Sequence, residues 1–407
     1  MQCRFCHKPL QYLFLSLGSF PLSNSFLTQE ELHQREIFYP LDVYVCDHCF
    51  PVQLQEYETP ENIFGDYAYF SSYSETWLKH AKDYVDKMVN LLKIDAHSSV
   101  IEIASNDGYL LQYFADRRIP VLGIEPARNV AEVARNKGIP TEAIFFGSET
   151  AKRLASEGKH ADLLLGNNVL AHVPSLNDFV KGLKILLKPQ GIITMEFPHL
   201  MRMMEETQFD TIYHEHFSYF SFLTVEKIFH AYGLTLFDVE ELSTHGGSIR
   251  IYARHPEDKT KPIGERVYQL RQKEIEAGYM DIQHYLNFDK KVKAIKKDIL
   301  KFLIHAKEED KRIVGYGAPA KGNTLLNYCG IRTDFIDYTV DRNPHKQGHF
   351  LPGSHIPIEG PNKIKETKPD YLFILPWNLK DEIIEQMNYI RDWGGKFVIP
   401  IPKIEVI

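Results

Sequence analysis

The chain has 407 residues, 44% hydrophobic and 25% charged, which gives room for roughly two to four domains and fits neither a disordered chain nor a membrane bundle. Its 54 acidic residues outnumber the 47 lysines and arginines, for a formal net charge of −7, and no long basic tract is interleaved with aromatic residues. A folded soluble protein is therefore predicted, and nucleic acid is excluded as an expected partner.

No stretch approaches the roughly 18 consecutive apolar residues that a membrane span requires. The start of the chain has neither the charged region nor the apolar core of a signal peptide, because Cys3 follows the first methionine almost at once. We therefore expect no membrane association and a cytoplasmic location.

Four of the five cysteines form two Cys-x-x-Cys pairs within the first 49 residues. Four such thiolates are typical of a closed tetrahedral site for structural zinc, whereas an oxidising compartment would not explain the pattern. Redox-active or unligated thiols are the alternative, and the fifth cysteine, Cys329, is expected to be a buried core thiol. With short strands at 12–15 and 42–46, residues 1–65 are predicted to form a small module on a metal held by Cys3, Cys6, Cys46 and Cys49.

Residues 75–93 place apolar side chains at helical spacing on one face, and a helix is predicted there. From residue 99 to 198, apolar strands alternate with amphipathic stretches, which is typical of a parallel sheet with crossover helices. The predicted strands of this sheet are 100–104, 121–125, 161–166, 191–197 and a late strand at 246–252.

Residues 265–310 are charged and free of proline, and they are predicted to form a linking helical segment. A second α/β alternation follows this segment, with predicted strands at 312–317, 338–341, 371–375 and 395–400. The chain is thus predicted to divide into three domains, at 1–65, 66–260 and 261–407.

The stretch 100–111 joins a strand to a helix through a turn of small residues. Such a turn lets a nucleotide-like cofactor approach the backbone, and Glu125, which ends the next strand, can accept both ribose hydroxyls. Ala104 and Asn106 stand where a dinucleotide-binding turn has glycines, and nearby acidic residues suit a cationic sulfonium better than a pyrophosphate. S-adenosylmethionine is therefore favoured over NAD, with a turn that binds no ligand as the alternative. The predicted cofactor-binding residues are Glu102, Ala104, Ser105, Asn106, Asp107, Gly108, Glu125 and Asn167.

Histidines and a carboxylate gather in residues 210–220, where Tyr213, His214, Glu215, His216 and Tyr219 fall within seven positions. The spacing is not His-Glu-x-x-His, which excludes a helical zinc-protease site. Histidine beside a carboxylate is the usual equipment for proton abstraction, and a solvated polar loop is the alternative. His172 follows an earlier strand into the same crevice, although a lone histidine is commonly a satisfied core residue.

A second turn of small residues, at 315–326, starts a helix near Lys321. Backbone amides and a lysine at a helix start would bind a diphosphate, and a purely structural turn is the alternative. Asp341 ends the next strand and could hold a ribose, and Trp377 or Tyr316 could offer a stacking face. The predicted substrate-binding residues are Gly317, Ala318, Lys321, Gly322, Asn323 and Asp341.

Taken in chain order, these motifs resemble the S-adenosylmethionine-dependent sugar C-methyltransferases, which act on deoxyhexoses attached to a nucleoside diphosphate. The similarity covers essentially the whole chain. It is carried by the two Cys-x-x-Cys pairs, Val100–Leu111, Ala171–Pro174, Tyr213–His216, His245–Ser248 and Gly315–Leu326.

The resemblance implies a Rossmann-like class I methyltransferase core between a small N-terminal zinc-binding module and a second, C-terminal Rossmann-like α/β domain. It implies methylation of carbon 3 of a dTDP-4-keto-deoxyhexose. Carried over by position, it suggests His216 as the general base, Tyr213 and Glu215 as its neighbours, and Tyr67 and His172 as further active-site groups. The family commonly has glycine where this chain has Ala104.

The chemistry agrees with these residues, because a 4-keto group acidifies the hydrogen on carbon 3 and its removal gives an enolate that can attack a methyl group. We expect His216 to take this proton while Tyr213 or His172 donates a hydrogen bond to the enolate oxygen. An NAD-dependent sugar-nucleotide oxidoreductase is one alternative, which the missing glycine fingerprint disfavours. A non-catalytic protein whose zinc module binds a partner is the other.

Overall fold

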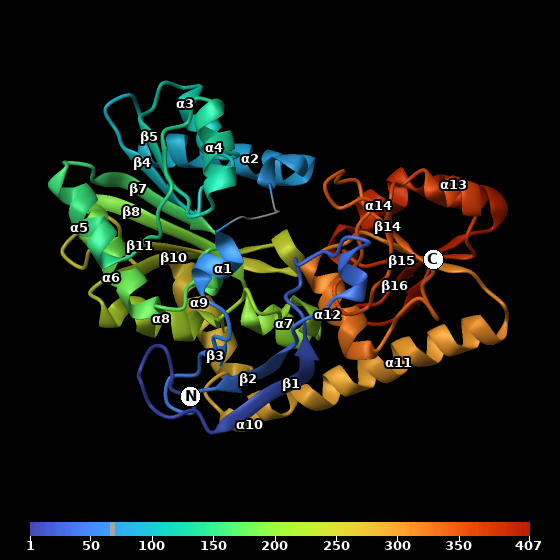
Figure 1. The fold of residues 1–407 in the computed structure, drawn as a ribbon. Helices are drawn as coiled ribbons and strands as arrows, with labels where there is room; N and C mark the ends of the chain where they lie inside the picture. The colour runs from blue at the N-terminus through green and yellow to red at the C-terminus, as the bar shows by residue number, and fades with distance from the viewer. Residues whose placement is uncertain (66–69) are drawn as a thin grey trace.

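The structure is a computed structural model, and it describes residues 1–65 and 70–407. Within these ranges the strands form three sheets, one in each of the lobes visible in Figure 1. Among the described residues, no helix is long and apolar enough to cross a membrane.

The N-terminal sheet has the order β1-β2-β3-β9 and is antiparallel throughout. Its last strand comes from far along the chain, since β9 directly follows the histidine cluster. The elements of this region are β1 (Tyr12–Phe20), η1 (Glu31–His33), β2 (Tyr39–Val45), β3 (Val52–Leu54), α1 (Pro60–Phe64), η2 (Ser71–Tyr73) and β9 (Ser218–Tyr219).

The central sheet has the order β10-β11-β8-β7-β4-β5-β6, with β8 to β6 parallel and the β10–β11 hairpin antiparallel at one edge. Its strands are β4 (Val100–Ile103), β5 (Val121–Ile124), β6 (Thr141–Glu142), β7 (Ala161–Asn167), β8 (Leu187–Pro198), β10 (Thr235–Leu242) and β11 (Ser248–Arg254). Its helices are α2 (Glu75–Leu92), α3 (Leu111–Ala115), α4 (Arg128–Asn136), α5 (Ser148–Ser156), η3 (Leu170–His172), α6 (Leu176–Leu186), α7 (Leu200–Glu205), η4 (Phe209–Thr211), α8 (Phe222–Ala231) and η5 (Thr244–Gly246).

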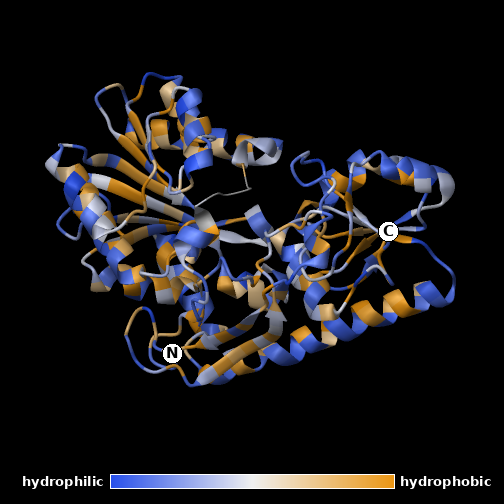
Figure 2. Cartoon of the chain, viewed as in Figure 1, coloured by the Kyte–Doolittle hydropathy of each residue, from blue (hydrophilic) through white to orange (hydrophobic). Residues whose placement is uncertain are grey.

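Helices cover both faces of this sheet, and the apolar strands lie between them, as the hydropathy colouring of Figure 2 shows. The first of these helices, α2, is amphipathic as predicted, with Trp77, Ala81, Tyr84, Val85 and Met88 buried. Ser74 starts it, because the serine side chain accepts a hydrogen bond from the amide of Trp77. The five predicted strands correspond to β4, β5, β7, β8 and β11, whereas β6 and β10 were not predicted.

The C-terminal sheet has the order β14-β13-β12-β15-β16-β17 and is parallel except at β17. Its strands are β12 (Ile313–Tyr316), β13 (Thr339–Val340), β14 (Ile358–Glu359), β15 (Tyr371–Ile374), β16 (Lys396–Ile399) and β17 (Glu405–Val406). The helices of this part of the chain are α9 (Glu265–Glu276), α10 (Ile282–Leu286), α11 (Phe288–Glu308), α12 (Ala320–Cys329), α13 (Lys363–Thr367), η6 (Trp377–Leu379), α14 (Lys380–Gln386) and η7 (Asn388–Trp393).

The helical segment that joins the two α/β units packs in two directions. Val267 and Leu270 of α9 are buried in the core of the central sheet, so this helix packs with the domain before it. The long helix α11 instead lies along the N-terminal and C-terminal lobes (Figure 1), and the Phe288 ring stacks on Phe14 of β1 at 5.0 Å. One hydrophobic core therefore runs from the N-terminal sheet into the C-terminal sheet.

Candidate active site

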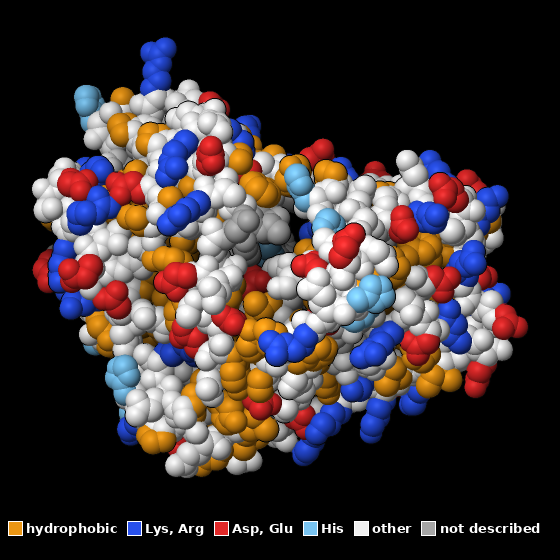
Figure 3. Space-filling view, viewed as in Figure 1, with side chains coloured by type: hydrophobic (Ala, Val, Ile, Leu, Met, Phe, Trp, Pro, Cys, Tyr) orange, Lys and Arg blue, Asp and Glu red, His pale blue; other side chains and the backbone are white. Residues whose placement is uncertain are grey.

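A cavity of about 1120 Å³ lies where the three lobes meet. It opens at the carboxyl ends of the central parallel strands, and Figure 3 shows the notch between the central lobe and the C-terminal lobe. Residues from all three lobes line it, among them Asn24, Glu125, His216, Lys321 and Lys346. Ligands of open α/β sheets bind at this edge, because loops after the strands carry side chains into one crevice.

The turn after β4 contains three residues in the left-handed backbone region. Ala104, Asn106 and Gly108 all have positive φ, at +56°, +50° and +77°. Ala104 and Asn106 thus occupy the conformation that favours glycine, at a cost of about 1 kcal/mol for each non-glycine residue. At Gly108 a side chain would be strained by the positive φ, and its Cβ would lie 3.0 Å from Cγ1 of Ile139.

Glu125 joins this turn to the end of β5. Its carboxylate accepts hydrogen bonds from the amides of Asn106 and Ala127, each at 2.9 Å. Burial raises the pKa of Glu125 to about 6, although these two amide bonds act in the opposite direction. The carboxylate lines the cavity and keeps acceptor capacity for hydroxyl groups.

The other predicted cofactor residues divide between the cavity wall and the layer behind it. Ala104, Asn106 and Asn167 line the cavity with Glu125, and the Asn167 amide donates to the Tyr109 hydroxyl at 3.1 Å. The remaining residues lie outside the described lining of the cavity: Glu102, Ser105, Asp107 and Gly108. Glu102 is fully buried in β4, where burial raises the pKa of its carboxyl well above the ordinary value.

Two hydrogen bonds define the state of His216. Its Nδ1 lies 2.9 Å from the carbonyl oxygen of Thr211, which can only accept, so the proton is on Nδ1. Its Nε2 therefore has the lone pair and accepts from the Tyr213 hydroxyl, also at 2.9 Å. Burial lowers the pKa of His216 well below its ordinary value, and nearby His172 adds to the shift. His216 is consequently a neutral imidazole whose basic nitrogen faces a phenol in the cavity.

His172 is a second neutral imidazole beside it, with ring centroids 4.6 Å apart. Its Nδ1 donates to the carbonyl oxygen of Glu215 at 2.8 Å, and burial lowers its pKa to about 4. With the proton on Nδ1, its Nε2 is an acceptor. Tyr213 and His172 were the two groups predicted to donate a hydrogen bond to an enolate oxygen. In this arrangement the Tyr213 hydroxyl can donate that bond, whereas Nε2 of His172 can only accept one.

Glu215 lines the cavity next to His216 and is held by the N-terminal lobe. Its carboxylate accepts a hydrogen bond from the Asn24 amide at 2.5 Å. The predicted active-site residue Tyr67 lies outside the described residues.

The C-terminal lobe contributes two lysines to the cavity. Lys321, in the first turn of α12, donates to Asn378 Oδ1 at 2.9 Å, and its Nζ lies 4.7 Å from the centre of the Trp377 ring. Lys346 donates to the Ala318 carbonyl oxygen at 2.8 Å and lies 3.9 Å from Asp341. Burial lowers the pKa of both ammonium groups, while Asp210 near Lys321 and Asp341 near Lys346 oppose that shift.

Pro319, Ala320 and Lys321 are the residues of the predicted substrate turn that line the cavity. The rest of this turn lies outside the described lining. Gly317 has φ +88°, and a Cβ there would lie 2.6 Å from Pro376. Asp341 accepts a hydrogen bond from the Ala318 amide at 2.8 Å. Gly322 packs on Leu375, and the buried Asn323 amide donates to the Ser23 carbonyl oxygen at 2.6 Å.

The sequence did not single out Asn24, Lys346 or His245 as site residues, yet all three line the cavity. Asn24 lies in a polar turn that has no local signal. Lys346 follows the second strand of an α/β unit, a position that could have indicated it. His245 has φ +55°, and its Nε2 lies 2.7 Å from the Asn168 amide nitrogen.

The four paired cysteines form a cluster whose sulfur atoms all lie within 4.8 Å of one another. Neighbouring sulfurs are 3.4 to 3.6 Å apart. Four thiolates at the usual Zn–S bond length have S···S distances of about 3.8 Å in a tetrahedron, so the cluster fits zinc closely. A closed set of four sulfurs leaves no open position for substrate, which makes the role of the ion structural.

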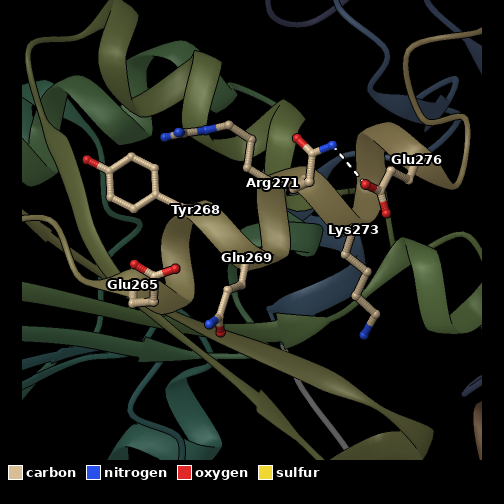
Figure 4. A pocket seen from close by; sticks show the side chains of 7 residues that line it. Glu265, Tyr268, Gln269, Arg271, Lys273 and Glu276 are labelled. Carbon is tan, nitrogen blue, oxygen red and sulfur yellow. Dashed lines mark hydrogen bonds between the residues drawn. The ribbon is translucent and has the colours of Figure 1, made fainter.

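A second hollow, of about 570 Å³, lies on the outer face of α9 (Figure 4). Its wall is one helix, and several of its polar side chains pair with each other, with α8 or with β10. Gln272 donates to Glu276 at 2.9 Å, and Arg271 contacts Glu226. None of the predicted site residues lies in the described lining of this hollow.

Comparison with known proteins divides the chain into three consecutive matches. A zinc-binding domain model matches residues 3–64, a methyltransferase domain model matches 77–239, and a C-methyltransferase C-terminal domain model matches 243–402. Over 406 residues the chain is 34% identical to the C-methyltransferase NovU of Streptomyces niveus, covering 100% of this chain and 96% of that protein. The chain belongs to this C-methyltransferase family. The predicted family, its α/β class I methyltransferase fold and its cofactors, S-adenosylmethionine and structural zinc, are confirmed.

This C-methyltransferase also has partial relatives. A ubiquinone biosynthesis O-methyltransferase of Bartonella tribocorum is 29% identical over 106 residues, which is 26% of this chain and 42% of that protein. The solved PH0226 protein of Pyrococcus horikoshii covers 49% of this chain and 99% of its own at 16% identity, with a TM-score of 0.38. The two alternatives of an NAD-dependent oxidoreductase and a non-catalytic protein are set aside, since the full-length relative is a C-methyltransferase.

Proposed function

We propose that this enzyme methylates a carbon next to a ketone, carbon 3 of a nucleoside-diphosphate 4-keto-deoxysugar, through an enolate. Methyl transfer to carbon requires a carbon nucleophile, and abstraction of an acidified α-hydrogen is the direct way to make one. The observation that supports this proposal is the Tyr213–His216 pair, a hydroxyl donor and a basic nitrogen 2.9 Å apart in the cavity.

That pair matches the two neighbouring groups of a ketone. The Tyr213 hydroxyl can turn from His216 to the carbonyl oxygen, which frees Nε2 for the hydrogen on the adjacent carbon. The proton moves from that carbon to Nε2, and the electron pair of the C–H bond moves into the enolate. The negative charge on oxygen is then stabilised by the tyrosine hydroxyl, which is already in place before the reaction.

The Nδ1 bond to the Thr211 carbonyl stabilises the imidazolium that results, because it holds the second ring proton. S-adenosylmethionine, when bound, supplies an electrophilic methyl group on a sulfonium. The chain would hold it with Ala104, Asn106, Glu125 and Asn167, whose placement on one wall fits a ribose and a short polar tail. Because the wall is formed at strand ends, the cofactor site opens into the same cavity as the base.

We assign the two lysines of the C-terminal lobe to the diphosphate, and a dTDP-linked sugar is the proposed form of the substrate. Lys321 and Lys346 bring two ammonium groups from the C-terminal lobe to the lining of the cavity. A chain of net charge −7 can still bind a dianion there, because a diphosphate responds to local potential more than to net charge.

The test is incubation with isotope-labelled S-adenosylmethionine and a panel of dTDP- and GDP-linked 4-keto sugars, followed by NMR of the product. The expected product carries the labelled methyl on the carbon next to the ketone of a dTDP sugar. Label on an oxygen or a nitrogen would contradict the enolate mechanism, and transfer to none of the 4-keto sugars would contradict the proposed substrate class.

A further inference from the structure

Trp377 lies at the contact between the C-terminal lobe and the methyltransferase lobe. The sequence offered it as a stacking face for a nucleoside, but its side chain is only 5% exposed. Its neighbours Pro376 and Asn378 are among the described residues that line the cavity, while the indole lies behind them. The contacts of this ring therefore point to a role inside the protein.

The indole contacts three parts of the active site. Its Nε1–H donates to the buried Asp210 carboxylate at 2.7 Å, and its face lies under Lys321. Its edge faces Gly246, where a Cβ would lie 2.6 Å from Cη2 of the indole. One side chain of the C-terminal lobe thus touches the turn before His216, the turn that carries His245 and the lysine of α12.

The first of these contacts leads to the general base. Asp210 belongs to η4, and the next residue, Thr211, holds Nδ1 of His216 through its carbonyl oxygen. The same turn is fixed from α12, since the Thr324 hydroxyl donates to the Ile212 carbonyl oxygen at 2.9 Å. The backbone that selects the tautomer of His216 is therefore anchored by side chains of the C-terminal lobe.

We propose that Trp377 is a positioning residue of the methyl-transfer reaction: through Asp210 it fixes the turn that orients His216, and through its ring it directs Lys321 into the cavity. The inference rests on the proposed role of His216. In this arrangement the C-terminal lobe orients the base in addition to binding the substrate. A displacement of about 1 Å at a reacting group can lower a rate by about a hundredfold, which sets the scale of the effect.

Burial raises the pKa of Asp210 to about 6, although Lys321 and the indole N–H oppose that shift. Removing the N–H donor therefore leaves a buried carboxylate with one partner fewer, a change that moves the turn.

The test compares Trp377→Phe with Trp393→Phe. Both variants remove one indole N–H from the C-terminal lobe, but Trp393 donates to the Pro369 carbonyl and is remote from the cavity. With a dTDP-4-keto-6-deoxyhexose as the probe, Trp377→Phe should lower kcat by about ten- to a hundredfold and raise KM for the sugar nucleotide, because Lys321 loses the indole face, while the calorimetric Kd for S-adenosylmethionine stays within about twofold of wild type. Trp393→Phe should keep the wild-type kcat. Equal kcat values for the two variants would overturn the proposal.

A double-variant cycle with Asp210→Asn tests the route. If Trp377 acts through Asp210, the kcat of the double variant is no lower than that of the worse single variant. If the two losses multiply instead, Trp377 does not act through this turn and the proposal is wrong.

Two further measurements keep this inference distinct from the proposed function. In protein labelled with ¹⁵N-histidine, the His216 signal, assigned by its loss in His216→Asn, should change from the Nδ1–H tautomer to a mixture in Trp377→Phe. An unchanged tautomer would contradict the inference without any assay of turnover. Wild-type kcat in His216→Asn would contradict the proposed function itself.

Discussion

At the scale of single residues, burial sets the protonation of the site. His172, His216 and His245 all lie in the cavity wall, and burial lowers the pKa of each, to about 4 for His172 and His245. A histidine that stays neutral well below pH 6.5 is available as a base throughout the physiological range. The tautomer of His216 is set by a backbone carbonyl, so it does not depend on a neighbouring charge.

The pH dependence of cofactor binding follows from Glu125. Its pKa of about 6 means that the carboxylate is ionised at pH 7.5 and mostly protonated at pH 5. Because the ionised form is the better acceptor for ribose hydroxyls, we predict that S-adenosylmethionine binds about tenfold more weakly at pH 5 than at pH 7.5. Calorimetry at the two pH values measures this change.

Glu125→Gln is the matched control, since its neutral amide should bind more weakly at pH 7.5 and show little change between the two pH values. A wild-type Kd that is the same at both pH values, with the fold intact by circular dichroism, would rule out Glu125 as the titrating group.

Local features could be read from the sequence, whereas contacts between distant segments could not. The four cysteines and the turn at Ala104, Asn106 and Gly108 are close in sequence or carry a regular spacing, so their chemistry could be inferred. Asn24 and Lys346 reach the cavity only because distant loops fold onto it, at sequence separations that no local pattern encodes. Asn323 was predicted as a substrate ligand from its place in a helix start, but its amide bonds to Ser23 of another lobe.

At the scale of elements, the segment that carries His216 is held by the zinc module. The strand β9 pairs with β3, and His214 Nε2 lies 3.2 Å from the carbonyl oxygens of Tyr39 and Pro40. Arg4, between two of the zinc-binding cysteines, donates to the Phe217 carbonyl oxygen at 3.2 Å. Because Phe217 directly follows His216, this hydrogen bond connects the metal site to the residue next to His216.

Removal of zinc should affect the base more than the cofactor. We predict that Cys46→Ala loses the metal and most methyl transfer, because Arg4 and β3 no longer fix residues 213–219. Binding of S-adenosylmethionine, whose turn lies on β4 and β5, should weaken by a smaller factor. Metal analysis, calorimetry and turnover on one preparation of each variant measure these effects.

The matched control is Cys329→Ala, which removes a buried thiol far from the cluster and should keep one zinc per chain. Full turnover in metal-free Cys46→Ala protein would show that the zinc module does not hold the base.

At the scale of the whole molecule, three lobes share one site. The alternation of strands and helices predicted both α/β sheets, since each strand is a short apolar run with its own turn. It did not predict that α9 packs on the central sheet or that β9 joins the N-terminal sheet, because both depend on which surfaces meet in three dimensions. Residues 210–219 lie at that meeting point, with Thr324 and Trp377 on one side and β3 on the other.

Exchange of the hydrogen on carbon 3 of a dTDP-4-keto-6-deoxyhexose with deuterium from solvent, followed by NMR, tests the role of His216 most directly. Wild-type enzyme should catalyse this exchange. His216→Asn should catalyse neither exchange nor methyl transfer while its Kd for S-adenosylmethionine stays unchanged, because the cofactor wall is formed by other residues. Near wild-type exchange in His216→Asn would contradict the assignment of the base. Methyl transfer by the wild-type enzyme without any exchange of the carbon 3 hydrogen would contradict the enolate mechanism.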